Sequence, residues 1–153
     1  MIKAKSFEPS LVTLGNPERI TDRLFVRAVF YNGAQPLVVQ LPPIVVSRGL
    51  YEMCGKWFVD VLVPYNTVLN SFLNCLNAAL NGTLPLTRTT HDSSGHYDHL
   101  RLRLLPNSAT LGVTHARQAG ATIAAIACVD RVGCNGHWEF VVDRIAPCVR
   151  GAG

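Results

Sequence analysis

The sequence is poor in charged residues, and acidic residues are the scarcest of them. Only 16% of its 153 residues are charged, whereas 48% are hydrophobic. This balance excludes a disordered chain, because disordered segments combine high charge with low hydrophobicity. Ten acidic residues stand against fourteen Lys and Arg, so the net charge is +4. The positive excess favours an anionic partner but is too small to require one.

Long apolar runs are absent as well. No stretch approaches the length of a membrane span, and the first six residues hold two lysines in place of the apolar stretch of a secretory signal. The five cysteines are odd in number and show no paired short spacing, which argues against a disulfide framework. We therefore expect a soluble intracellular protein in a reducing compartment, with no membrane partner.

Signatures of catalysis are also missing. No Ser or Cys lies in a nucleophile elbow, no glycine-rich loop suited to phosphates is present, and the acidic residues are scattered rather than paired. Cys134 and His137 have the spacing of half a zinc site, but no second half of equal quality is present. The sequence predicts a non-enzymatic protein without catalytic residues, metal or cofactor. A metal-dependent enzyme is a third class of function, tested by the metal content of the purified protein.

Strand patterns dominate what the sequence does contain. Asn32-Gly33 is the strongest short hairpin signal in the chain. Pro42 and Pro43 donate no backbone hydrogen bond, so the strand after this hairpin must bend between Leu41 and Ile44. Alternation of apolar residues predicts strands at residues 11–14, 23–31, 35–46, 56–63, 99–104, 121–132 and 137–145.

One segment has the period of an amphipathic helix. Apolar residues recur on one face over residues 68–80, Asn66 or Thr67 is suited to cap the helix, and Gly82 is suited to end it. Residues 83–95 are rich in Thr, Ser, Pro and Gly and are expected to form a loop. About seven strands and one helix indicate a mainly β protein.

Two of the expected strands are basic, and the first is also aromatic. Residues 23–31 place Leu24, Val26, Ala28 and Phe30 on one face and Arg23, Phe25, Arg27 and Tyr31 on the other. Residues 99–104 place Leu100, Leu102 and Leu104 inward and Arg101 and Arg103 outward. Arginines spaced by rings suit a single-stranded nucleic acid, because guanidinium groups pair with phosphates while bases stack on rings. An ordinary solvated sheet face is the alternative, since Arg and aromatic neighbours also pack across strands.

The order of segments resembles that of a known family. Tyr31-Asn32-Gly33, Pro36–Gln40, Leu41-Pro42-Pro43 and Arg48-Gly49-Leu50 together resemble a run in the OB-fold-like single-stranded DNA-binding proteins of large nucleocytoplasmic DNA viruses. Residues 56–63, 69–80 and 99–104 look like that family's next strand, helix and basic strand, and residues 120–132 with 136–140 look like its closing hairpin. The similarity covers residues 23 to 146, and Arg48 stands where the family has an aromatic residue.

The resemblance implies an OB-fold-like β-barrel with one α-helix. The barrel domain would span residues 23–146, after an extension with a short strand at residues 1–22 and before a tail at residues 147–153. The helix is expected to plug or flank the barrel.

The resemblance and the basic strands together predict a non-catalytic, sequence-independent single-stranded DNA-binding protein. RNA is the other ligand that fits the pattern. We expect a homo-oligomer that acts in DNA replication, recombination or repair, in the host nucleus or a cytoplasmic viral factory. The predicted nucleic-acid contacts are Arg23, Phe25, Arg27, Tyr31, Lys56, Phe58, Arg101 and Arg103. The alternative is a viral structural or scaffold protein of the virion that self-assembles into a shell or filament, favoured by the high apolar content and scarce charge.

Overall fold

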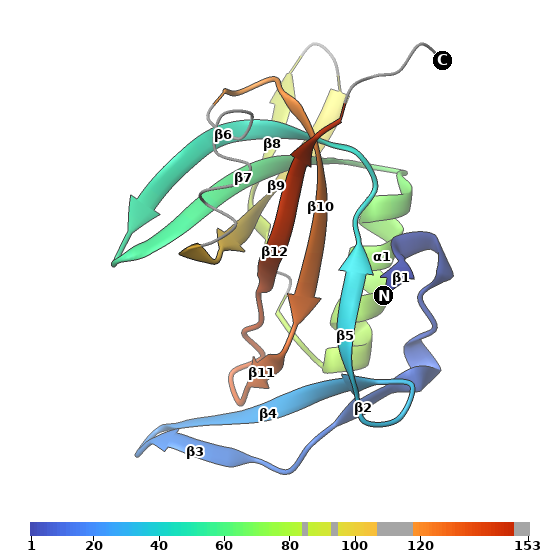
Figure 1. Cartoon of the computed structure of the whole chain (residues 1–153), viewed down its shortest axis with the longest axis vertical. Coiled ribbons are helices and arrows are strands. Elements are labelled where there is room, and N and C mark those ends of the chain that lie inside the picture. Colours follow the sequence, from blue (N-terminus) through green and yellow to red (C-terminus); the bar gives the residue numbers. More distant parts are fainter. Residues whose placement is uncertain (84–85, 93–94, 107–117, 149–153) are drawn as a thin grey trace.

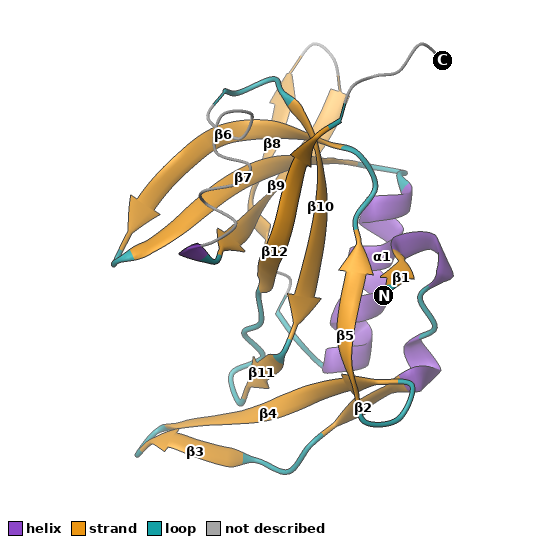
Figure 2. Ribbon diagram, viewed as in Figure 1, coloured by secondary structure: helices purple, strands orange, loops and turns teal. Residues whose placement is uncertain are grey.

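Strands make up most of the protein in the computed structural model, which describes residues 1–83, 86–92, 95–106 and 118–148 (Figures 1 and 2). They are β1 (Ile2–Lys3), β2 (Val12–Leu14), β3 (Glu18–Thr21), β4 (Leu24–Tyr31), β5 (Gln35–Gln40), β6 (Ile44–Met53), β7 (Lys56–Pro64), β8 (Leu86–Asp92), β9 (Gly95–Leu104), β10 (Thr122–Val129), β11 (Arg131–Gly133) and β12 (Phe140–Pro147). The helical segments are α1 (Val68–Leu80) and two short 3-10 turns, η1 (Ala4–Ser6) and η2 (Pro9–Leu11). Within these ranges, the prediction of a mainly β protein with one α-helix is confirmed.

Five strands close into a barrel in the order β6, β7, β9, β12, β10. Closure occurs where Thr122 and Ile123 of β10 pair with Val45 and Ile44 of β6. β9 and β12 run parallel, and the other neighbours in the barrel run antiparallel. This is a five-stranded barrel of the OB-fold-like class, as predicted.

β5 and β6 form one path that bends at Pro42 and Pro43. The later half of β10 pairs with Leu37–Gln40 of β5, and its first residues pair with β6. Because neither proline donates a backbone hydrogen bond, the ladder stops there and resumes at Ile44. The predicted corner is confirmed.

α1 closes the core between the barrel and the N-terminal turns. Its buried face consists of Leu69, Phe72, Leu73, Leu76 and Leu80. Phe72 contacts Phe140 of β12, with 6.2 Å between ring centroids, and Phe7 near η1, with 5.2 Å. Thr67 caps the helix as predicted, because its Oγ1 accepts a hydrogen bond from the backbone N–H of Asn70 at 3.2 Å. The helix ends at Asn81, which adopts the left-handed conformation that was expected of Gly82 (φ 49°).

β3 and β4 form an arm that lies below the barrel in Figure 1. Beyond its pairing with β3, β4 pairs with β2, β5 and β11. β1 pairs in parallel with β5. Residues 1–22, expected to be an extension with one short strand, therefore contribute three strands to the sheet around the barrel.

Two predictions about the later strands are wrong. Residues 86–92 were expected in a loop, but they form β8, which pairs antiparallel with β9. Residues 131 and 132 were expected to continue the strand that forms β10, but they belong to β11, which pairs with β4. The partner of β8 is β9, which follows after a turn, and the partner of β11 is β4, which is distant in the sequence. The apolar pattern of a segment does not reveal such pairings.

The described chain has further features that bear on the predictions. All five cysteines are free thiols. No helix among the described residues is long and apolar enough to cross a membrane. Of the predicted tail at residues 147–153, Pro147 ends β12 and residues 149–153 lie outside the described part.

Candidate nucleic-acid interface

A cleft of about 530 Å³ opens between the arm and the barrel. Its lining comprises Ile20, Leu24, Val26, Thr83, Arg101, Arg103, Asp130, Arg131, Gly133, Asn135, His137, Trp138 and Glu139. The arm and the β6–β7 hairpin project to the same side of the molecule (Figure 1). The cleft thus lies between the arm, β9 and the segment that joins β10 to β12.

β9 presents two arginines to the cleft by simple strand alternation. Leu100, Leu102 and Leu104 are buried inside the barrel, so the residues between them face outward. The side chains of Arg101 and Arg103 are 37% and 26% exposed. The prediction that the leucines of this strand face inward and its arginines face outward is confirmed.

Arg101 belongs to a hydrogen-bonded network on the outer face of β6, β7 and β9. Its Nε donates to the hydroxyl of Tyr51 at 2.8 Å, and that hydroxyl donates to Oδ1 of Asp60 at 2.7 Å. Asp60 is only 8% exposed, and Arg101 Nε lies 3.9 Å from its Oδ1. The buried carboxylate is thereby satisfied by two partners. Burial, with a further contribution from Asp60, raises the pKa of Tyr51.

Rings and guanidinium groups form a layered stack around Tyr51. The ring of Phe58 lies beneath it, with centroids 5.7 Å apart and planes 30° apart. The guanidinium carbon of Arg48 lies 3.8 Å from the Tyr51 ring centroid. Arg48 is exposed, so its planar group forms the outer layer of the stack and offers a surface on which a base can stack.

Arg103 carries an ion pair at the entrance to the cleft. Its terminal nitrogen lies 3.0 Å from Oε1 of Glu139, whose side chain is 42% exposed. A pair so open to water is weak, because solvent and salt screen it. An incoming phosphate can therefore compete with Glu139 for this guanidinium.

Trp138 forms a fixed floor to the cleft. It is 6% exposed, its Nε1 donates to Oδ1 of Asn77 at 3.0 Å, and its ring meets the edge of Phe140. Gly82 makes this packing possible, since a Cβ there would lie 2.6 Å from Cδ1 of Trp138. The end of α1 and the start of β12 thus hold the ring in place.

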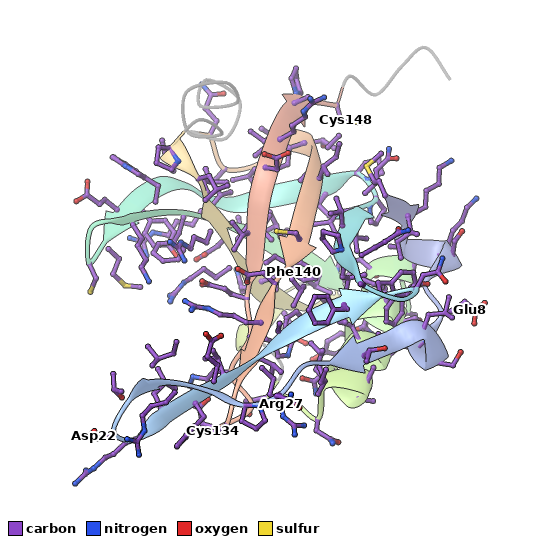
Figure 3. The ribbon with its side chains drawn as sticks, turned by 60° about the horizontal axis from the view of Figure 1, so that its bottom comes forward. Glu8, Asp22, Arg27, Cys134, Phe140 and Cys148 are labelled. Atoms are coloured by element: carbon purple, nitrogen blue, oxygen red, sulfur yellow. The ribbon has the colours of Figure 1, made fainter. Side chains whose placement is uncertain are left out.

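The first basic strand does not add its arginines to this cleft. Leu24 and Val26 of β4 line it, while Phe25 and Arg27 alternate with them and are exposed on the other face of the strand. Arg23 follows Asp22, which lies at the tip of the arm (Figure 3). The two basic strands, both predicted to contact nucleic acid, therefore do not share this cleft. A contact of Arg23, Phe25 or Arg27 with nucleic acid stays a prediction.

Tyr31 does not face outward as predicted. It is 7% exposed, stacks on Phe7 with 5.7 Å between centroids, and its hydroxyl accepts a hydrogen bond from the backbone N–H of Glu8 at 2.9 Å. The alternation of β4 changes phase after Arg27, so that Val29 and Tyr31 both join the core. In this half of β4 the face that carries Val29 and Tyr31 is covered by the main core, with Phe7 packed against Tyr31.

The prediction that Phe58 stacks on a base is also wrong. It is 6% exposed, because Tyr51 covers its ring and the Arg101 guanidinium carbon lies 5.4 Å from its centroid. Its role is to support Tyr51. Lys56 is exposed as predicted, beside the Cys54-Gly55 turn at the tip of the β6–β7 hairpin.

Sequence reasoning missed Arg48, Tyr51 and Arg131. The predicted strand ended at residue 46, but β6 continues to Met53 with two shifts in its register to β7. The alternation of buried residues at Ile44 and Val46 was the available signal for a strand that continues beyond residue 46. Among the described residues, no group of three His, Cys, Asp or Glu side chains is arranged to hold a metal ion.

Comparison with protein-family models, curated proteins and solved structures found no match to this chain. The resemblance to viral DNA-binding proteins therefore stays a prediction. The functional argument depends on the geometry of the site.

Proposed function

We propose that this protein binds single-stranded DNA, without catalysis and without regard to sequence. The observation that supports this proposal best is the stack of Arg48, Tyr51 and Phe58, which Arg101 connects to the cleft. OB-fold barrels bind oligonucleotides across their second and third strands and the neighbouring loops. In this barrel the corresponding strands are β7 and β9, the ones that carry Phe58, Asp60, Arg101 and Arg103.

Each part of the interface has a physical role in this proposal. A base stacks on the exposed guanidinium of Arg48, which Tyr51 holds flat from below. Arg101 and Arg103 neutralise phosphates on the way to the cleft. The Nε of Arg101 is engaged with Tyr51, which orients the rest of its guanidinium group. Contacts of this kind do not depend on base identity, because every base has a π face and every nucleotide a phosphate.

The proposal predicts binding that weakens steeply with salt. Fluorescence anisotropy with a labelled oligothymidylate of about 16 nucleotides, at about 50 mM and about 200 mM salt, measures it directly. The double variant Arg48→Ala, Arg103→Ala is expected to bind roughly tenfold to a hundredfold more weakly, since each lost charged contact costs on the order of 1 kcal/mol. The slope of log K against log salt should also become shallower by about 0.7, because Arg103 is the one phosphate contact that this variant loses.

A charge-matched control separates site binding from general attraction. Lys5 and Arg144 are exposed and lie outside the cleft, so Lys5→Ala, Arg144→Ala removes the same charge elsewhere. Equal losses in both double variants would show that only the net charge matters, and absence of binding at low salt would refute the proposal. An oligouridylate of the same length, measured in parallel, compares RNA with DNA.

The order of segments supports a role in DNA replication, recombination or repair, through the resemblance of residues 23–146 to viral DNA-binding proteins. Those processes expose single strands that need a sequence-independent binder. The scarcity of charge on the rest of the chain is compatible with self-association along such a strand.

A further inference from the structure

The two walls of the cleft differ in chemistry. Ile20, Leu24 and Val26 of the arm form an apolar wall, and Ile20 keeps 49% of its exposure. Arg101 and Arg103 of β9 form a cationic wall. A ligand that fits both walls must have a flat apolar part and an anionic part close together.

The charge and size of the cleft limit that ligand to a small unit. Three arginines and two carboxylates line it, Arg101, Arg103 and Arg131 against Asp130 and Glu139, which leaves one positive charge. This surplus balances about one phosphate rather than a run of phosphates. The volume of about 530 Å³ lies in the range of sites for small molecules rather than of long grooves.

The floor and rim complete a site for a base. Trp138 is held by Asn77 and Phe140, and at 6% exposure it fixes the floor of the cleft without offering a ring face for stacking. Asp130, Glu139 and Asn135 at the lining carry acceptors suited to the N–H groups of a base edge. The arm is thus one wall of a built site, not a loose extension.

We propose that the cleft holds one nucleotide of the bound strand, turned away from the barrel face. Its base lies against Ile20 and Leu24, and its phosphate lies against Arg101 and Arg103. This inference rests on the proposed function, because it assumes that a single strand crosses the barrel. It adds that the arm clamps the strand, which makes the N-terminal residues part of the binding site.

Photo-crosslinking locates the nucleotide. A strand of about 16 nucleotides in which every base is 5-iodouracil is bound and irradiated, and the crosslinked peptides are identified by mass spectrometry. Crosslinks are expected on residues 20–26 or on His137, in addition to Tyr51. Crosslinks confined to Tyr51 and its neighbours, with binding intact, would overturn this inference and leave the proposed function standing. Absence of binding at low salt would overturn both.

A matched pair of surface variants measures the contribution of the apolar wall. Ile20→Ser removes an exposed aliphatic side chain from the cleft and is expected to weaken binding roughly fivefold, the value of one partly buried side chain. Val68→Ser is the control, because Val68 is equally exposed at 51% and lies on α1 outside the cleft. Equal affinity of the two variants would contradict the inference.

Fluorescence provides an independent readout of the cleft. The chain has two tryptophans, Trp57 and Trp138, so Trp57→Phe leaves Trp138 as the single emitter. Trp57 is 37% exposed, and its replacement is expected to leave the fold intact. The emission of Trp138 should change on titration with the oligothymidylate. Unchanged emission at saturation, established by anisotropy, would also overturn the inference.

Discussion

Tyr51 is the residue on which the outer face of the barrel depends. Its hydroxyl stands between Arg101 and the buried carboxylate of Asp60, and its ring separates Phe58 from Arg48. A buried charge without partners is costly, so this hydroxyl stabilises the fold, while the ring supports Arg48 on the surface that we propose to bind DNA. Tyr51 therefore serves both stability and the proposed function.

Tyr51→Phe is expected to lower the free energy of unfolding by about 1–3 kcal/mol, because it leaves Asp60 with one distant partner. The pKa of Tyr51 is raised, first by burial and then by Asp60. A raised pKa in the folded state means that this contribution is complete below the ordinary tyrosine pKa of about 10 and is lost as the pH rises above it.

Urea unfolding of both proteins between about pH 7 and about pH 11 measures this effect. The difference in unfolding free energy should be constant up to about pH 10 and shrink above it. A difference that does not change with pH would show that the ionisation of Tyr51 is not coupled to folding.

At the scale of elements, the segment after α1 packs closely against the segment before β12, at Gly82 and Trp138. A Cβ on Gly82 would lie 2.6 Å from Cδ1 and 2.7 Å from Nε1 of Trp138. The glycine is required here for space rather than for a left-handed backbone. This contact couples the helix to the floor of the cleft.

Gly82→Ala is expected to reduce the free energy of unfolding by about 1–3 kcal/mol through overpacking, and to shift the emission of Trp138. Gly15→Ala is the control, since a Cβ there would lie 3.4 Å from its nearest neighbour, in the ring of Phe30, and Gly15 has no positive φ. Urea unfolding followed by fluorescence measures both variants. Equal stability of the two would show that Trp138 moves aside without cost.

Some elements were predictable because their signals are local. The cap at Thr67, the apolar period of α1 and the turn at Asn32-Gly33 involve residues close in sequence. The alternation of β9 was predicted correctly because its inner face is covered along the whole segment from Leu100 to Leu104. The alternation of β4 was not predicted correctly, because the buried side changes along the strand: Val26 is buried in its first half, and Val29 and Tyr31 join the core in its second half.

At the scale of the whole molecule, binding should stabilise the fold. A ligand present at about 100 times its dissociation constant raises the free energy of unfolding by about 2.7 kcal/mol. We expect oligothymidylate to raise the midpoint of thermal unfolding at low salt and to lose this effect at high salt. A shift that persists at high salt would indicate a contact that is not electrostatic, and no shift at low salt would contradict the proposed function.

Light scattering of the free protein tests its state of association. The expected homo-oligomer would have a small and defined mass. A large ordered assembly without nucleic acid would favour the structural alternative, a shell or filament.

The sequence by itself determined the class of fold, the helix, the main turns and the outward direction of Arg101 and Arg103. These follow from spacing, proline chemistry and caps, which act between near neighbours. Only the tertiary structure decided that Tyr31 and Phe58 are covered, that Arg48 and Tyr51 stack, and that the arm faces β9 across a cleft. Those outcomes depend on which distant strands pair, and a period-two pattern specifies two faces without specifying what covers each.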